Sequence, residues 1–208
     1  MDRMMRSKPT MHHEYILFNK PFGVLSQFTD EEGRKTLSSF GPFPKGVYPV
    51  GRLDADSEGL ILLTDDNDVK HFLLEPRYDH SRTYLTQVER IPSEEALTEL
   101  RGGIIIEGKK TKKAGACLLD KEPEVPPREV PIRFRKNVPT AWLEITLYEG
   151  RNRQVRKMTA AIGHPTLRLI RTVLGPLTLA GLKPGEHRHL SRSELTSLLE
   201  FVHRSQRS

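Results

Sequence analysis

Gly51-Arg-Leu-Asp-Ala-Asp-Ser-Glu-Gly-Leu60 places three acids and an arginine between two glycines of this 208-residue chain. The segments on either side, residues 46–50 and 60–64, are apolar and partly β-branched, which predicts two strands. Glycine and aspartate favour a tight connection between such strands. We therefore expect a polar loop between two strands, and we expect the chemistry to lie in that loop.

Three interpretations of this loop compete. It has acids at the first, third and fifth positions of a calcium-binding loop, but an EF-hand needs flanking helices and normally ends in Glu, whereas Asp65 stands there. An acidic turn can also simply cap backbone amides. In the third interpretation, Arg52 and a distant arginine cluster keep Asp54 ionised as a nucleophile or base.

Strand and helix patterns alternate on both sides of the loop. Residues 14–18 and 82–88 have strand character, and the first segment runs into a Pro-Gly turn that places Lys20 at a strand end. Residues 93–101 are typical of a short helix capped by serine, and residues 142–148 alternate with period two. The pattern predicts one folded unit of mixed strands and helices.

An arginine cluster follows the strand predicted at residues 142–148. Arg151, Arg153 and Arg156 lie within one short stretch, where apolar residues at helical spacing begin a helix that Gly163 ends. The cluster therefore falls on a strand-to-helix turn and a first helical turn. Arginines in that position can reach a shared ligand.

The C-terminal part of the body is predicted to be structural. Ser191 and Glu194 form a capping box before a helix whose apolar stripe extends to Val202. Residues 120–131, rich in Pro and Glu, indicate an irregular surface connection between two halves of the sheet. Cys117 lies in an apolar run, and we assign it to the core.

The ends of the chain lack periodicity. We interpret residues 1–12 and 203–208 as flexible tails, which leaves residues 13–202 as the folded domain. No run approaches the length of a membrane span and no signal peptide is evident, so we expect a cytoplasmic protein without membrane contact.

The charge of the chain favours a polyanionic partner. Its formal net charge is +6, and basic side chains bind phosphates by releasing condensed counterions. The lysine-rich run at residues 109–113 is more simply a solvated face. We expect no cofactor and no metal, since His187 and His189 lack a third ligand at a useful spacing.

Two motifs resemble the signature sequences of one enzyme family. The loop at residues 51–60 resembles the catalytic signature of the pseudouridine synthases of the RsuA type, and Glu149-Gly-Arg-Asn-Arg-Gln-Val-Arg-Lys-Met158 resembles their second signature. The resemblance runs from Ile16-Leu-Phe-Asn-Lys-Pro-Phe-Gly23 to about Arg171, most of the folded body. It implies an α/β (α+β) fold, with a mixed, largely antiparallel sheet in two subdomains, flanking helices and a central cleft.

Within this family the chain is most similar to enzymes of the large ribosomal subunit. Leu17-Phe-Asn-Lys-Pro21, Gln27-Phe-Thr-Asp30, Gly33-Arg-Lys-Thr-Leu37 and residues 143–170 carry this similarity. The implied partner is 23S ribosomal RNA or a large-subunit assembly intermediate. Many relatives carry an N-terminal RNA-binding domain of the S4 type, for which residues 1–12 are too short. We expect a monomer that selects its substrate through the catalytic body and its short tails.

The resemblance also implies roles for single residues. Asp54 corresponds to the catalytic aspartate, Arg52 to the residue that helps to hold the target base out of the stack, and Tyr84 to the aromatic ring against which uracil packs. Arg156 is expected to be the ion-pair partner that keeps Asp54 charged.

Three other basic residues are candidate RNA contacts. Arg151 and Arg153 are expected to contact phosphates. Lys20 either reaches the site or covers apolar surface with its stem.

The expected reaction is isomerisation of a specific uridine to pseudouridine after base flipping. Asp54 can attack C1′ of the ribose, remove a proton from C2′, or attack C6 of the base. The sequence does not distinguish these three mechanisms. Two alternatives remain: the same chemistry on 16S ribosomal RNA or another large-subunit site, and a non-catalytic RNA-binding or ribosome assembly protein. An intact Asp54 together with Arg156 and Tyr84 disfavours the second, because binding phosphates needs no buried carboxylate.

Overall fold

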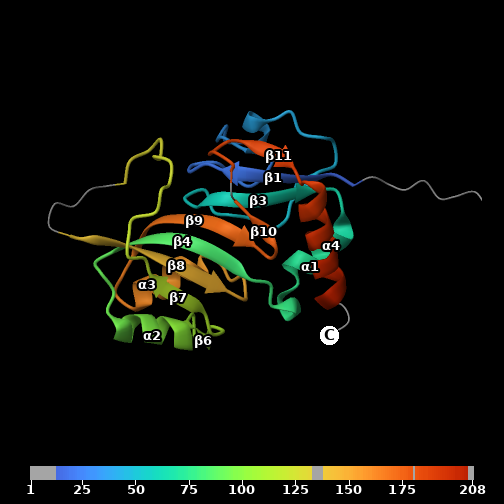
Figure 1. Cartoon of the computed structure of the whole chain (residues 1–208). Helices are drawn as coiled ribbons and strands as arrows, with labels where there is room; N and C mark the ends of the chain where they lie inside the picture. The colour runs from blue at the N-terminus through green and yellow to red at the C-terminus, as the bar shows by residue number, and fades with distance from the viewer. Residues whose placement is uncertain (1–12, 133–137, 180, 206–208) are drawn as a thin grey trace, which may run out of the picture.

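A nine-stranded sheet forms the centre of the molecule (Figure 1). The computed structural model of the chain describes residues 13–132, 138–179 and 181–205. The strands of the sheet are β1 (Tyr15–Lys20), β2 (Tyr48–Pro49), β3 (Glu58–Thr64), β4 (Arg82–Glu89), β7 (Gly115–Leu118), β8 (Thr140–Leu147), β9 (Thr166–Leu174), β10 (Leu177–Thr178) and β11 (His187–His189). A separate hairpin consists of β5 (Ile105–Ile106) and β6 (Lys109–Lys110).

Helices cover the two ends of the sheet (Figure 1). They are α1 (Asn67–Leu74), α2 (Glu94–Gly102), α3 (Gln154–Ala161) and α4 (Arg192–Ser205), with short 3-10 helices η1 (Leu37–Phe40) and η2 (Pro76–Tyr78). The pair α1 and α4 lies at one end, and α2 and α3 lie at the other. Over the residues described, no helix is both long and apolar enough to cross a membrane.

The strand order is β11-β1-β3-β9-β4-β8-β7, with β2 added to β3 and β10 to β9. Every pair in this sheet is antiparallel except β3 with β9, which meet only at Glu58 with Ile170 and at Gly59 with Arg171. The predicted mixed, largely antiparallel sheet is confirmed. The short parallel contact joins two antiparallel halves, and the polar loop at residues 51–57 enters the sheet at this point.

Gly59 is required at the junction of the two halves. Its φ is +104°, and a Cβ placed on it would lie 2.3 Å from the carbonyl oxygen of Arg171. Only a residue without a side chain permits this approach. The glycine that follows the acidic loop therefore allows the two backbones to meet.

Two clusters of buried apolar side chains stabilise the sheet. The first includes Phe18, Ile61 and Leu143, together with side chains of α2 and α3. The second includes Leu17 and Leu62, together with side chains of α1 and α4. Burial of this apolar surface is the main favourable contribution to folding.

Polar side chains cap the first turns of α1, α2 and α4. Ser93 Oγ accepts a hydrogen bond from the Ala96 amide at the start of α2, as predicted. The predicted capping box of α4 is confirmed: the Ser191 amide donates to the Glu194 carboxylate at 2.8 Å, and the Glu194 amide donates to Ser191 Oγ at 3.3 Å. Asp66 caps α1, a helix that the sequence pattern did not predict.

Two predictions about the 115–131 region are wrong. Cys117 is exposed, because β7 is an edge strand and the side chain projects to solvent instead of toward the core. The connection at residues 120–131 does not join two halves of the sheet, since it leads from β7 to the neighbouring strand β8. Alternation in a short strand shows which side chains share a face, but not which face is covered.

The predicted C-terminal tail begins too early. Residues 203–205 continue α4 to Ser205, because no glycine or proline after Val202 ends the helix. The predicted N-terminal tail at residues 1–12 and the end of the chain at residues 206–208 lie outside the described residues.

Candidate active site

A cleft of about 800 Å³ opens where the two halves of the sheet meet. Its lining comes from the acidic loop, β4, the turn before α3 and β9, and it includes Arg52, Asp54, Tyr84, Arg151, Arg153 and Arg171. Residues far apart in the sequence thus share one cavity. The predicted central cleft is present, and it contains both sequence motifs.

Backbone contacts fix the acidic loop. Ser26 Oγ donates to the Leu53 carbonyl at 2.7 Å and accepts from the Leu53 amide at 3.1 Å. The Gly23 amide donates to the Ala55 carbonyl at 2.7 Å. Asp54 is thereby held between two anchored neighbours, which limits the conformations that its carboxylate can adopt.

Asp54 lies partly open to the cleft, with a side chain that is 39% exposed. Its carboxylate is 3.3 Å from Arg153 Nη1. The same guanidinium donates to both carboxylate oxygens of Asp56, at 3.0 and 2.8 Å. Arg153 therefore bridges the two aspartates, and its stronger contact is with Asp56.

The predicted ion pair between Arg156 and Asp54 is wrong. Arg156 donates from Nη2 to the Asp56 carbonyl at 2.7 Å, and its Nε lies 3.4 Å from the Asp56 carboxylate. Arg153 makes the direct contact with Asp54 instead, because it sits in the turn before α3, whereas Arg156 is one turn further along and meets the loop at Asp56.

Asp56 is an ionised anchor of the network. Burial raises its pKa, but the hydrogen bonds of Arg153 and the charge of Arg156 outweigh this effect and hold the pKa below the usual range. A carboxylate that stays charged can keep both arginines in place beside Asp54.

Tyr84 lies on β4 and is 8% exposed, with part of its surface in the cleft. A β-bulge between Thr83 and Tyr84 shifts the register with β9, so that Tyr84 pairs with Arg171. Bulges of this kind redirect side chains next to functional sites. An aromatic ring is therefore available in the same cavity as Asp54.

The predicted RNA contact of Lys20 is wrong, because its side chain is fully buried. Nζ donates to the carbonyls of Pro21, Val24 and Ala55, at 2.9, 2.8 and 3.4 Å. Burial lowers the pKa of Lys20 to about 8, against the opposing charges of nearby acids. Lys20 therefore holds the acidic loop through the Ala55 carbonyl and is not part of the cleft lining.

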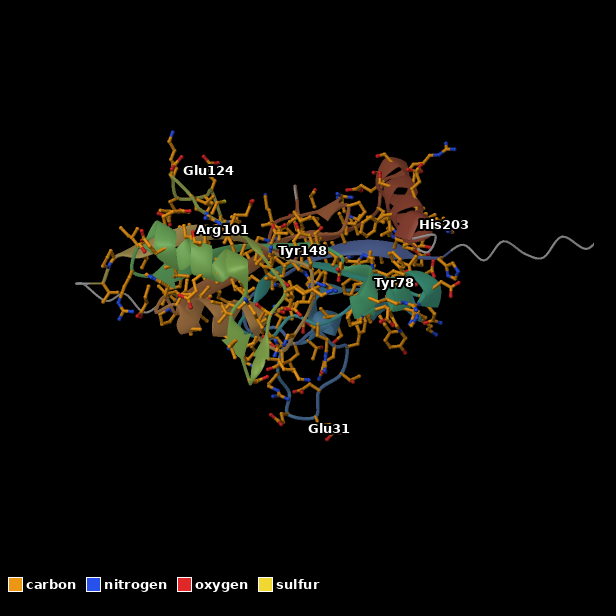
Figure 2. The ribbon with its side chains drawn as sticks, turned by 90° about the horizontal axis from the view of Figure 1, so that it is seen from below. Glu31, Tyr78, Arg101, Glu124, Tyr148 and His203 are labelled. Atoms are coloured by element: carbon orange, nitrogen blue, oxygen red, sulfur yellow. The ribbon has the colours of Figure 1, made fainter. Side chains whose placement is uncertain are left out.

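Two projections stand beside the cleft. Figure 2 shows the loop that carries Glu31 and the β5–β6 hairpin extending from the same side of the molecule. The cleft lining includes Gln27, near the first projection, and Arg151, which donates to the Ile106 carbonyl at 2.8 Å and the Lys109 carbonyl at 3.2 Å. Arg151 thus supports the hairpin, and its phosphate contact remains a prediction, as does the role of Arg52.

Sequence reasoning missed three features of the site: the anchor Ser26, the carboxylate of Asp56, and the buried guanidinium of Arg171. Ser26 gave no signal, because its partner is a backbone group 27 residues away. Arg171 did give one: an arginine inside the apolar strand sequence Leu-Ile-Arg-Thr-Val-Leu is rarely buried without a reason. Within the described residues, no three His, Cys, Asp or Glu side chains are grouped to hold a metal ion.

Comparison with known proteins agrees with this geometry. Residues 14–161, well over half of the chain, match the family described as RNA pseudouridylate synthase. The chain belongs to this family. Enzymes of the RNA pseudouridylate synthase family isomerise uridine in RNA to pseudouridine, so the predicted enzyme class is confirmed.

Curated relatives of this synthase cover most of its length. It is 50% identical over 171 residues to ribosomal large subunit pseudouridine synthase E of Xanthomonas axonopodis pv. citri, covering 81% of this chain and 90% of that protein. It is 40% identical to ribosomal large subunit pseudouridine synthase B of Bacillus subtilis, over 88% of this chain and 70% of that protein.

A solved structure of a pseudouridylate synthase has the same fold. Its crystal structure superposes with a TM-score of 0.75 at 30% sequence identity, covering 90% of this chain and 74% of that one. The fold class that the sequence resemblance implied is therefore confirmed.

Proposed function

We propose that this synthase isomerises one specific uridine of 23S ribosomal RNA, with Asp54 as the catalytic carboxylate. The observation that carries the proposal is the presence of Asp54 and Tyr84 in one cleft of about 800 Å³ that arginines surround. A cavity of this size accommodates a nucleotide that has been flipped out of its stack.

The cleft supplies each group that the isomerisation needs. The ring of Tyr84 offers a stacking surface for uracil, and Arg52 at the cleft wall supports the displaced strand. Asp54, beside Arg153, attacks C1′ or removes a proton from C2′ when the bond from N1 to C1′ breaks. Uracil then turns and bonds to C1′ through C5.

The names of the relatives support the choice of substrate. Proteins that are 47 to 50% identical to this chain are called ribosomal large subunit pseudouridine synthase E. We propose that this chain acts on the same RNA, either free or in a large-subunit assembly intermediate. We further propose that residues 13–205 form a catalytic unit that works as a monomer in the cytoplasm. A formal charge of +6 gives this unit salt-dependent affinity for RNA.

The test is tritium release from C5-labelled uridine in 23S and 16S transcripts. Native enzyme is compared with Asp54→Asn and with Asp120→Asn, a control at an exposed aspartate in the connection between β7 and β8. We expect release from 23S transcripts with native enzyme and the control. Loss of the catalytic carboxylate should reduce the rate by at least about 10³-fold.

Each other result identifies what fails. Release from 16S transcripts alone would keep the chemistry and move the substrate. Full activity of Asp54→Asn would overturn the role of Asp54. Tight RNA binding without release, also from a large-subunit assembly intermediate, would leave a non-catalytic assembly protein as the better description.

A further inference from the structure

Arg171 is a buried cation without a carboxylate partner within the described part of the chain. Its side chain is 3% exposed, and Nε donates to the Leu60 carbonyl at 2.8 Å. Its Nη2 atom has no hydrogen-bond partner. Burying a charge without a carboxylate partner costs several kcal/mol. Such a cost makes Arg171 a candidate for a functional role.

The neighbouring arginine on the same strand shows the usual arrangement. Arg168 is equally buried, but it donates to both oxygens of Glu58 at 2.8 Å, and it lines a separate pocket of about 380 Å³. Arg171 belongs to the cleft that contains Asp54. The compensated arginine thus lies away from the candidate site, and the uncompensated arginine lies in it.

The position of Arg171 connects the two parts of the site. Its backbone pairs with Gly59, which follows the acidic loop, and with Tyr84 on β4. Its guanidinium donates a hydrogen bond to the Leu60 carbonyl. Burial lowers the pKa of Arg171, and the nearby hydroxyl of Tyr84 raises it. Arg171 therefore contacts the strand that leaves the acidic loop and lies beside the ring of Tyr84.

We propose that Arg171 is a positioning residue that orients Tyr84 and supplies uncompensated positive charge to the floor of the cleft. This charge stabilises the negative charge that uracil carries after it is detached. The inference rests on the proposed function, because it concerns the same cleft and the same reaction.

The chemistry explains why positive charge is useful there. When the N1–C1′ bond breaks, its electron pair stays on uracil, which becomes an anion. In one route the Asp54 carboxylate forms a bond to C1′. In the other route the sugar loses its C2′ proton to Asp54 and later regains it. C5 of the rotated base then bonds to C1′ while the bond between C1′ and Asp54 breaks, or while the glycal regains its C2′ proton. The C5 proton leaves, and N1 gains a proton. A fixed charge in a water-poor site stabilises the anion without reorganisation.

The experiment varies the leaving group. Arg171→Gln, Arg168→Gln and native enzyme are compared in single turnovers at saturating enzyme, on transcripts made with uridine or 5-fluorouridine. Loss of the N-glycosidic nucleoside is measured by chromatography and mass spectrometry. Fluorine withdraws electrons, so detached 5-fluorouracil is a more stable anion and depends less on the protein for stabilisation.

We expect Arg171→Gln to slow the reaction of uridine by about 10²-fold and that of 5-fluorouridine by less than about tenfold. Arg168→Gln removes a buried ion pair and should slow both substrates equally. An equal loss on both substrates with Arg171→Gln would show a purely structural role and overturn the proposal.

Arg171→Lys keeps the test decisive if the glutamine variant does not fold, as judged by circular dichroism. Because the charge is retained, we expect less than about a tenfold loss on uridine. A loss near 10²-fold in this folded variant would refute the proposal. Native enzyme that converts no uridine in any RNA would instead refute the proposed function, and the role of Arg171 would fall with it.

Discussion

At the scale of single residues, the site depends on which arginine contacts which aspartate. Arg153 contacts Asp54 and Asp56, and Arg156 contacts only the second of these through its nitrogen atoms. The sequence resemblance favoured Arg156 as the partner of Asp54 and assigned Arg151 and Arg153 to phosphates. Their positions on the turn and on the helix decide the pairing, since a shift of three residues moves a side chain by almost a full turn.

Arg153→Gln should therefore affect the rate more than RNA affinity. We expect the single-turnover rate to fall by about 10²-fold, the scale for one preorganised charge at a reacting group. The measurement pairs single-turnover kinetics with filter binding, and Arg192→Gln, an exposed arginine at the start of α4, is the control. Weakened binding with an intact rate would restore the phosphate contact that the sequence predicted.

Lys20→Met tests the buried lysine. The folded-state pKa is about 8, below the ordinary 10.5, so the unfolded chain binds more protons between these values and stability rises with pH there. We expect urea denaturation to show this rise in native enzyme and its loss in the variant. The salt dependence of RNA binding should not change; a slope smaller by about one would mean that Lys20 does contact a phosphate.

At the scale of elements, the starts of α2 and α4 follow local rules and are independent of the site. The capping box of α4 has an added ion pair, because Arg188 on β11 donates to both oxygens of Glu194 at 2.7 Å. The hydrogen bonds of Arg188 and of Ser191 lower the pKa of Glu194 to about 2. The box thus ties the last strand of the sheet to the last helix.

Glu194→Gln should destabilise the protein in a pH-dependent way. A depressed folded-state pKa gives stability that is present above the ordinary pKa of 4.5 and lost as pH falls toward 2. At pH 7 we expect the variant to be less stable by about 1 kcal/mol, the usual cost of a lost cap. Urea denaturation at pH 7 and pH 3 checks this; a difference that does not shrink at pH 3 would contradict it.

At the scale of the whole molecule, the active site exists because two antiparallel half-sheets meet through a short parallel contact. Only two residue pairs join β3 and β9. The acidic loop ends there, and β4 and the turn before α3 contribute from the other half. The cleft is therefore a property of the sheet topology, not of any one segment.

Gly59→Ala should damage this junction. The new Cβ would meet the backbone of Arg171 at 2.3 Å and would also occupy an unfavourable φ of +104°. We expect a loss of about 3 kcal/mol or more in the free energy of unfolding, measured by urea denaturation. Gly163→Ala has a similar φ of +84° with nothing within 4 Å and should cost only about 1 kcal/mol. Equal losses would mean that strain alone matters.

The sequence was enough to predict most strands and helices, the family and the presence of Asp54 and Tyr84 in the site. Strand alternation, helix caps and turn glycines act over a few residues, so a sequence pattern reports them directly. The two motifs also stand in the order that the family resemblance implies. Helix α1 was missed, because its eight residues carry too short a periodic pattern.

The tertiary structure alone decided which arginine meets Asp54, that Lys20 is buried beneath the loop and that Cys117 is exposed on an edge strand. It also revealed Arg171 as a cation without a carboxylate partner among the described residues. These properties depend on partners distant in the sequence and on which face of a strand another layer covers. A local sequence pattern contains no information on either, because burial and charge pairing are determined only when the two halves of the sheet come together.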